Sequence, residues 1–315
     1  MRTAYLLRRV VQIVPLVLGV VAVNFLIIHL TPGDPASALA GDMAPPEYVE
    51  ELRRQYGLDK PVIVQLLVYF KHLLTGDLGY SFSYQQPVAS LVLDRVPATV
   101  LLILAAQIPA IIFGTLLGAL AARHHGSWAD RLVSILVSLG LALPSIWVAL
   151  LLSLLFAVKL HWVDVAAYTP FEESPLRWAR GLLLPAVALS LHTAAVLARQ
   201  VRSAMLEALA SSYVHAMRAR GLREPVIVLR YAVRNAMVPV LSVAAIQMSV
   251  LMGASIAVER IFALPGLGTL LIDSVVRGDF PILQGAVLVI ATAVLAINLA
   301  ADVGYALINP KVRAS

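Results

Sequence analysis

Six long stretches without a lysine, arginine, aspartate or glutamate constrain this 315-residue sequence more than any other feature. A helix needs about 20 apolar residues to cross the hydrocarbon of a bilayer, and lipid offers no hydrogen-bond partner to an unpaired backbone group. Each stretch is therefore predicted to be a transmembrane helix, and the chain an all-α polytopic membrane protein with six spans. The stretches are Val10–Gly33, Val96–Ala122, Leu132–Val158, Gly181–Ala198, Asn235–Val258 and Phe280–Ala301.

The composition excludes an ordinary soluble protein. Hydrophobic residues make up 60% of the chain and charged residues 13%, whereas soluble domains are about 45–50% apolar and about 25% charged. The chain has no cysteine, which excludes disulfides, thiolate metal sites and a thiol nucleophile.

The positive charges are distributed unevenly between the predicted spans. With the N-terminus placed in the cytoplasm, the cytoplasmic segments hold 14 of the 24 lysines and arginines but three of the 18 acidic residues. The outer segments then hold the other 10 cations and 14 acids. Because loops rich in Lys and Arg stay on the cytoplasmic side, both chain ends are predicted to be cytoplasmic (N-in, C-in). The same pattern accounts for the net charge of +6 without a nucleic-acid partner.

These arguments divide the chain into thirteen segments. The fourth span is extended past its charge-free stretch because the long side chain of Arg199 can reach the interface. The segments are a cytoplasmic N-terminus (1–9), span 1 (10–30), a large extracytoplasmic loop (31–96), span 2 (97–122), a cytoplasmic loop (123–131), span 3 (132–158), an extracytoplasmic loop (159–180), span 4 (181–200), a cytoplasmic loop (201–236), span 5 (237–258), an extracytoplasmic loop (259–280), span 6 (281–303) and a cytoplasmic tail (304–315).

The large loop is predicted to carry two helices of its own. Pro45-Pro46 starts a polar helix that Gly57 ends, and a second helix runs from Pro61 to about Leu74 with an apolar face. The stretch Leu78–Leu93 is read as loop. A loop of this size usually carries structure or function, so it is either a cap over the outer ends of the spans or a docking surface for a soluble partner.

The segment Arg199–Asn235 combines seven arginines with turn signals. Arg199–Arg220 is predicted to continue span 4 as a helix. Gly221 stands where a C′ glycine is expected and Pro225 where a helix begins, which predicts a sharp corner between them. One face of that helix would hold Leu206, Leu209, Tyr213, Ala216, Met217 and Arg220. Such a helix either lies on anionic lipid or docks into a groove of another protein; its composition alone favours lipid.

The predicted spans contain few residues that could catalyse a reaction or bind a ligand. No metalloprotease, nucleophile-elbow or nucleotide-binding motif occurs in the sequence, which argues against a membrane enzyme. Gly114 and Gly118 form a G-x-x-x-G, a weak signal for close helix packing. Pro144 could supply a hinge in span 3, although simple curvature is the expected effect. With no nucleotide site and no charge relay, the chain is either a passive conduit or one part of a larger machine.

The arginine-rich segment resembles the permease loop of bacterial ABC importers, and most closely the first permease subunit of the dipeptide/oligopeptide/nickel branch. The resemblance covers essentially the whole chain, in order and spacing. It rests on Ser211–Leu222, Arg230–Val240, Thr31–Pro35, Gly76–Ser81, Pro87-Val88, Arg95–Thr99, Glu259–Phe262, Leu264–Gly268, Asp279–Pro281 and Tyr305–Pro310.

The resemblance implies a type I ABC importer permease fold and reverses the preference for lipid. In these importers the loop is a coupling helix that sits in a cleft of a cytoplasmic ATPase. The wider superfamily has Glu-Ala-Ala and then a Gly six residues after the Glu; here His215 replaces the Glu and Gly221 fits the Gly. The implied ATPase-coupling residues are Tyr213, Val214, His215, Ala216, Met217, Arg218, Arg220 and Gly221.

The resemblance also implies the partners. They are a second homologous permease subunit that forms a heterodimer with this chain, two cytoplasmic ABC ATPases that use ATP and Mg²⁺, an extracytoplasmic substrate-binding protein and membrane lipid. The chain itself needs no cofactor, has no catalytic or metal site, and is expected in the bacterial inner membrane. Di- and oligopeptides are the expected substrates. Nickel, glutathione or another small solute within the same family, and a stand-alone channel or secondary carrier as a different class, are the alternatives.

Overall fold

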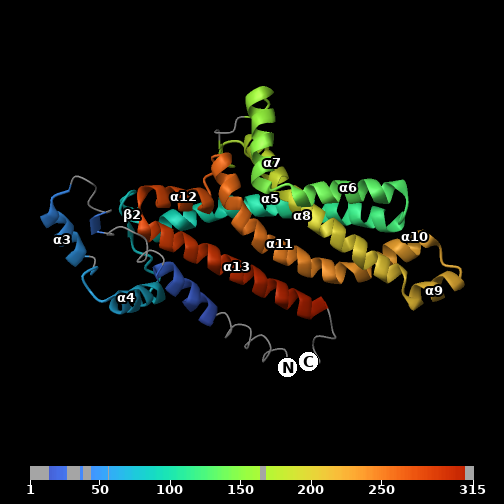
Figure 1. Cartoon of the computed structure of the whole chain (residues 1–315), viewed down its shortest axis with the longest axis horizontal. Coiled ribbons are helices and arrows are strands. Elements are labelled where there is room, and N and C mark those ends of the chain that lie inside the picture. Colours follow the sequence, from blue (N-terminus) through green and yellow to red (C-terminus); the bar gives the residue numbers. More distant parts are fainter. Residues whose placement is uncertain (1–13, 27–35, 38–43, 56, 164–167, 309–315) are drawn as a thin grey trace. The chain divides into compact units, whose positions relative to one another are not determined.

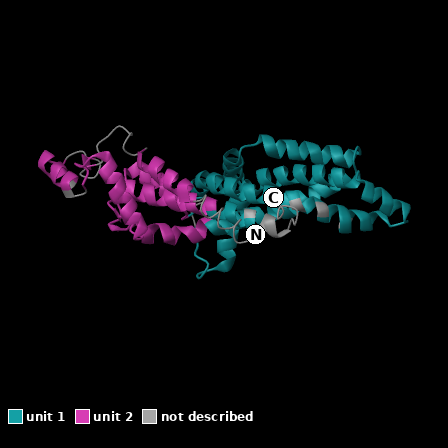
Figure 2. Cartoon of the chain, turned by 90° about the horizontal axis from the view of Figure 1, so that it is seen from below, with its two compact units in different colours: residues 1–6, 100–264, 296–315 teal, residues 7–99, 265–295 magenta. Residues whose placement is uncertain are grey.

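A computed structural model describes residues 14–26, 36–37, 44–55, 57–163 and 168–308 of the chain. These residues are mostly helical, as the sequence predicts. They fall into two compact units (Figure 2): unit 1 comprises residues 1–6, 100–264 and 296–315, and unit 2 comprises residues 7–99 and 265–295. Two long helices, α5 (Val88–Arg123) and α13 (Phe280–Ile308), contribute residues to both units.

Unit 1 is organised around helix α8, which lies against α6, α7 and α11 (Figure 1). Ser174 caps the start of α8 by accepting a hydrogen bond from the backbone N–H of Arg177, and Pro175 occupies its first turn. The helices and π-helical turns of this unit, apart from α5 and α13, are α6 (Trp128–Ala142), α7 (Ser145–Leu152), η1 (Ser153–Lys159), α8 (Pro175–Leu209), α9 (Ser212–Ala219), α10 (Glu224–Val226), η2 (Ile227–Ala232) and α11 (Val233–Ile261).

Small residues allow α5 and α6 to approach α8 closely. A Cβ at Gly118 of α5 would lie 2.5 Å from the carbonyl oxygen of Ala198, and one at Gly114 would lie 2.8 Å from Cβ of Leu197. A Cβ at Gly140 of α6 would lie 2.9 Å from Cβ of Ala195. The weak G-x-x-x-G signal therefore marks a real helix contact, and α8 is the partner.

The third predicted span is broken rather than curved. Helix α6 ends at Ala142, α7 begins at Ser145, and the two helices meet at an angle of 95°. Pro144 is the N-cap of α7 and has an extended backbone. Since proline has no N–H to donate and its ring clashes with the preceding turn, the helix stops here. The expectation of simple curvature at Pro144 was wrong.

Unit 2 holds the two helices of the large loop and a hairpin. The helices α3 (Pro46–Gln55) and α4 (Val62–Leu74) match the two predicted in the large loop, and Gly57 has the positive φ of 65° expected of a stop. The strands β1 (Tyr80–Ser81) and β2 (Gln86–Pro87) pair antiparallel, with Tyr80 opposite Pro87. Helix α5 then begins at Val88, inside the stretch read as loop, so that reading was wrong for Val88–Leu93.

The core of unit 2 joins segments far apart in the sequence. Leu267 and Leu270 of helix α12 (Leu267–Arg277) pack with Ile282 of α13 against the first turns of α5, where Val88 and Val92 are fully buried. The backbone N–H of Leu267 donates to Oγ1 of Thr99 at 2.8 Å. Several of the motifs that are scattered along the sequence thus meet in one packed cluster within this unit.

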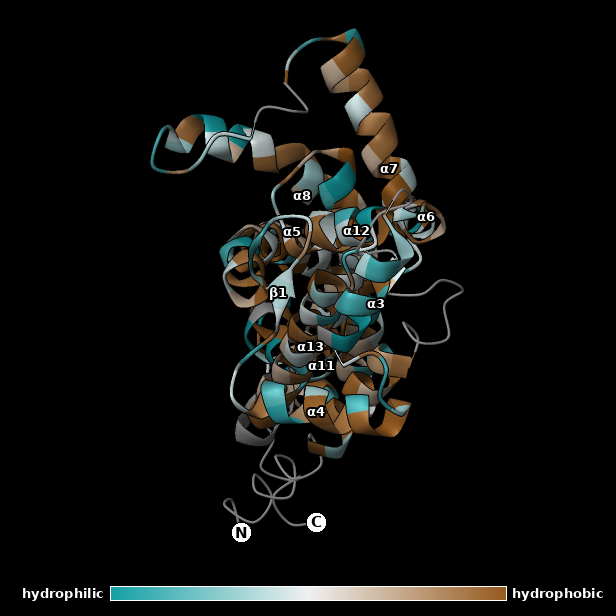
Figure 3. Cartoon of the chain, turned by 90° about the vertical axis from the view of Figure 1, so that its left-hand side faces the viewer, coloured by the Kyte–Doolittle hydropathy of each residue, from teal (hydrophilic) through white to brown (hydrophobic). Residues whose placement is uncertain are grey.

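Four described helices are long and apolar enough to cross a membrane, and the bent pair α6 and α7–η1 would make a fifth. Helix Val14–Leu26 lies inside the first charge-free stretch, whose remaining residues fall outside the described part of the chain. Figure 3 shows the hydrophobic residues that cover α7, in contrast with the hydrophilic α3. The count of six spans and their orientation stay predictions.

Candidate functional site

The α8–α11 connection, residues 210–232, is where the sequence places the coupling residues. It does not continue α8 to Arg220 as predicted. Helix α8 ends at Leu209, Ser211 has an extended backbone (φ −73°, ψ 151°), and α9 starts afresh at Ser212. The hydroxyl of Ser211 donates to the carbonyl oxygen of Ala208 at 2.5 Å. A serine that bonds to a nearby backbone group competes with the helix, and this bond accompanies the break.

The break also divides the predicted single face. Leu206 and Leu209 stay on α8, half-buried against the hydrophobic core of unit 1. Tyr213 and Met217 are four residues apart on one face of α9, as the sequence predicts, and Arg220 is the C-cap residue of that helix. The surface available to a partner is therefore short and belongs to α9 alone.

The corner after α9 is the predicted one. Gly221 has a φ of 77°, its N–H donates to the carbonyl of Arg218 at 3.0 Å, and the N–H of Leu222 donates to the carbonyl of Met217 at 3.2 Å. This pair of bonds is a Schellman motif, which needs a left-handed residue at C′. A Cβ at Gly221 would have no neighbour within 4 Å, so the backbone conformation, and not lack of space, favours glycine here.

An ion pair closes the corner. Arg218 donates from Nη2 to Oε1 of Glu224 at 2.5 Å and from Nε to Oε2 at 3.1 Å. These hydrogen bonds lower the pKa of Glu224 and raise that of Arg218. Both side chains are largely exposed, so water and salt screen the pair. Sequence reasoning missed Glu224; the signal that could have found it was an opposite charge six residues beyond Arg218, across a predicted glycine turn.

The eight predicted coupling residues divide by burial. Val214 is 0% exposed, so in this conformation its side chain belongs to the core of the unit and cannot form part of a contact surface. Met217 is half-buried, and Tyr213 is 36% exposed. Nδ1 of His215 lies 3.0 Å from the carbonyl oxygen of Ser211. The remaining exposed members are His215, Ala216, Arg218, Arg220 and Gly221.

The connection is tied to both helices that it joins. The turn η2 buries Val228 and Ala232 against Val201 and Met205 of α8, in one cluster that continues into α11. Such interiors are close-packed and transmit strain. A displacement of this connection would therefore move α8 and α11 together.

The α8–α11 connection brings together cations, an aromatic ring and a rigid turn, which suit contact with another protein. Within the described ranges of the chain, no group of three or more His, Asp or Glu residues could hold a metal ion.

Comparisons with known proteins identify the family. Residues 114–314 match the binding-protein-dependent transport system inner membrane component, and residues 2–103 match the N-terminal part of such membrane components. A protein of Brucella melitensis that carries the name peptide transport system permease protein is 43% identical, over 99% of both chains. The glutathione transport system permease protein GsiC of Salmonella typhimurium is 37% identical, over 98% of both chains.

A solved structure supports the fold. A chain of the MetNI methionine ABC transporter, in an inward-facing conformation, superposes with a TM-score of 0.58 and 19% identity, over 70% of this chain and 96% of that chain. The type I importer permease fold is thereby confirmed. The chain belongs to the family of binding-protein-dependent transport system inner membrane components and is a multi-pass permease subunit of a bacterial ABC importer in the inner membrane.

Proposed function

We propose that this chain forms half of the pathway of an importer of di- and oligopeptides, with a second, homologous permease subunit supplying the other half. The observation that carries the proposal is the full-length similarity to the Brucella protein named for peptide transport, at 43% identity. The predicted spans also hold few charges, which suits a solute that carries many neutral amide groups better than a bare metal ion.

Glutathione is the second candidate substrate. The 37% identity to GsiC, over 98% of both chains, favours it. Glutathione is itself a small peptide, so the same pathway chemistry serves both substrates. An uptake assay in which unlabelled glutathione competes with a labelled dipeptide shows which of the two substrates the importer takes.

The proposed coupling residues act through contact with one of two cytoplasmic ATPases, which bind ATP and Mg²⁺. This requires the chain to be oriented N-in and C-in, with residues 201–236 in the cytoplasm and residues 31–96 available outside to the substrate-binding protein. When the ATPases close on ATP, the exposed face of α9 moves with them. The Schellman corner at Gly221 fixes the direction in which the chain leaves α9, and the packed cluster around η2 passes the displacement to α8 and α11.

The test is uptake by the reconstituted complex. The chain, its second permease, the two ATPases and the binding protein are placed in proteoliposomes, and labelled dipeptide uptake and ATP hydrolysis are measured together. Gly221→Val puts a β-branched residue at a φ of 77°, which such side chains rarely adopt. Met217→Glu puts a charge into the half-buried centre of α9. Both variants should hydrolyse ATP while losing uptake.

Gly221→Asn is the matched comparison. Asparagine tolerates the left-handed conformation, and its side chain would enter open space. It should therefore retain much more uptake than Gly221→Val. Equal uptake by all three variants and the unmodified complex would refute the coupling role. Uptake by this chain alone, without ATPases, would refute the importer assembly.

A further inference from the structure

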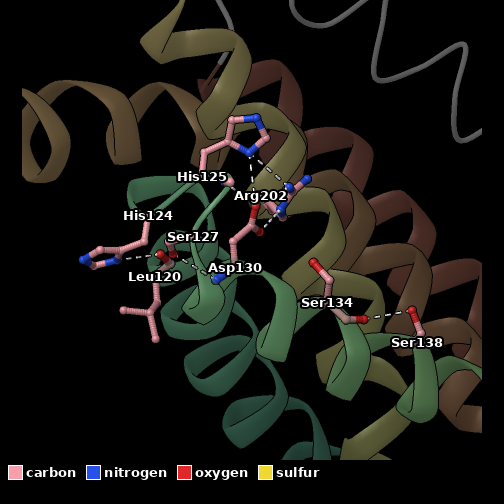
Figure 4. Close-up of polar contacts among 9 residues, drawn as sticks. Leu120, His124, His125, Ser127, Asp130, Ser134, Ser138 and Arg202 are labelled. Carbon is pink, nitrogen blue, oxygen red and sulfur yellow. Dashed lines mark hydrogen bonds and ion pairs between the residues drawn. The ribbon is translucent and has the colours of Figure 1, made fainter.

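A buried carboxylate links two helices near the α8–α11 connection (Figure 4). Asp130, on the first turn of α6, is 4% exposed. Arg202 of α8 holds it with two hydrogen bonds, from Nε to Oδ1 at 2.7 Å and from Nη2 to Oδ2 at 2.8 Å. This bidentate geometry is the strong form of an arginine–carboxylate pair.

Further donors complete the site. Oδ2 of Asp130 accepts from the backbone N–H of Gly126 at 3.0 Å and lies 3.1 Å from Nδ1 of His125. That ring nitrogen is also 3.2 Å from Nη2 of Arg202. The N–H of Asp130 donates to Oγ of Ser127, the N-cap of α6, at 3.4 Å. The turn between α5 and α6 is thus folded around the same carboxylate that binds α8.

The helix contact beside this pair is close. Gly118 of α5 faces the carbonyl oxygen of Ala198 and the side chain of Val201 on α8, and Gly140 of α6 faces Cβ of Ala195. Small residues let backbones approach closely, and apolar contacts of this kind have no direction of their own. The bidentate pair adds a directional contact that fixes how α6 lies along α8.

The position of Arg202 places this pair between the coupling segment and α6. It lies within about two turns of the end of α8 at Leu209, where the connection that carries α9 begins. Asp130 lies at the start of α6, which leads to the 95° bend and α7. A displacement that enters α8 from α9 therefore meets the Asp130–Arg202 pair early.

We propose that Asp130 and Arg202 form a latch that makes the α5–α6 hairpin move with α8 during transport. They are positioning residues: they transmit the displacement of the coupling segment to the third span and touch neither substrate nor nucleotide. This inference rests on the proposed function of α9.

Single variants test the latch in the reconstituted complex. Asp130→Asn keeps the shape of the side chain but removes its charge, and Arg202→Gln removes the bidentate donor. Uptake per ATP hydrolysed should fall about tenfold, the factor that corresponds to the lower end of the net worth of a charge-assisted hydrogen bond. The controls are Arg131→Gln, next to Asp130 on α6, and Arg199→Gln, one turn from Arg202 on α8. Both side chains are exposed, and both variants should keep the coupling ratio of the unmodified complex.

A covalent rescue separates transmission from mere stability. The chain has no cysteine, so Asp130→Cys combined with Arg202→Cys creates the two thiols of a defined cross-link. Joining them with a short bis-methanethiosulfonate, which forms a disulfide with each thiol and releases methanesulfinate, should restore uptake per ATP hydrolysed, and reductant should abolish it again. The same reagent should have no effect on either single cysteine variant.

Three results would overturn the latch. One is an unchanged coupling ratio in Asp130→Asn and Arg202→Gln. Another is a loss of uptake that comes with a proportional loss of ATP hydrolysis and a lower Tm. The third is a loss of uptake per ATP hydrolysed that the cross-link does not restore. Gly221→Val, measured alongside, keeps the two proposals apart. If it uncouples and Asp130→Asn does not, the latch is wrong and α9 keeps its role; if Gly221→Val also stays coupled, the role of α9 is wrong.

Discussion

The contact between α5 and α8 predicts a large effect from a single methyl group. Gly118→Ala would place a carbon 2.5 Å from the carbonyl oxygen of Ala198 and 2.7 Å from Cβ of Val201. Neither neighbour can move by a change of rotamer. Ordinary contacts at such a carbon are 3.4–4 Å, so the two helices must separate by about 1 Å at this point.

The expected cost follows from packing. Overpacking a close-packed interior costs about 1–3 kcal/mol, while alanine gains up to about 1 kcal/mol over glycine as a helix former. Gly253→Ala isolates that gain, because Gly253 lies inside α11 and the methyl group of an alanine there would have no atom within 4 Å. The difference between the two variants is therefore the overpacking cost alone.

Thermal unfolding of the purified chain in detergent measures this difference. A change of 1 kcal/mol shifts the Tm of a domain of 150–250 residues by about 2–4 °C, so Gly118→Ala should melt about 2–12 °C below Gly253→Ala. Both are scanned at one rate, because unfolding of such a protein is expected to be irreversible. Equal melting temperatures would refute the close approach of α5 and α8.

Two further perturbations test the polar contacts. Asp279 is 1% exposed and accepts hydrogen bonds from Oγ of Ser81 at 2.7 Å and from the N–H of Ser83 at 2.9 Å. Asp279→Ala should lower the free energy of unfolding by about 1–3 kcal/mol and speed hydrogen exchange across residues 80–87. The control Asp77→Ala should leave hydrogen exchange at Ser83 unchanged. The pKa of Glu224 is lowered by Arg218, so the stability from this pair is present above the ordinary pKa of 4.5 and is lost as pH falls through the lower folded value. Proteolysis of the α8–α11 connection should rise on acidification and in high salt, and Glu224→Gln should remove both dependences.

The sequence predicted features that depend on local chemistry. Charge-free stretches located the long helices because a bilayer tolerates few charges, and Gly221 located the corner because a left-handed C′ residue favours glycine. Helix α4 followed from its apolar pattern in the same way. Each of these signals lies within about one helix length of the feature that it predicts.

Features that depend on tertiary context were missed. Ser211 breaks the helix before α9, although Ser also occurs inside α6 and α8 without a break. The burial of Val214 depends on the surrounding helices, and the bend at Pro144 is much larger than a proline kink requires. Asp130 and Arg202 are 72 residues apart, and a single sequence gives no sign that they meet.

Helix α8 connects the corner at Gly221, which the sequence predicts, with the Asp130–Arg202 pair, which it does not predict. Helix α9 ends in a Schellman corner at Gly221 and is separated from α8 by the break at Ser211. In the proposed mechanism, the cluster of Val201, Met205, Val228 and Ala232 would pass a displacement of α9 to α8 and α11. The Asp130–Arg202 pair would then join α6 to the movement of α8. Substitutions at the corner should therefore abolish all motion of the spans, whereas substitutions at the latch should leave α8 and α11 moving without α6.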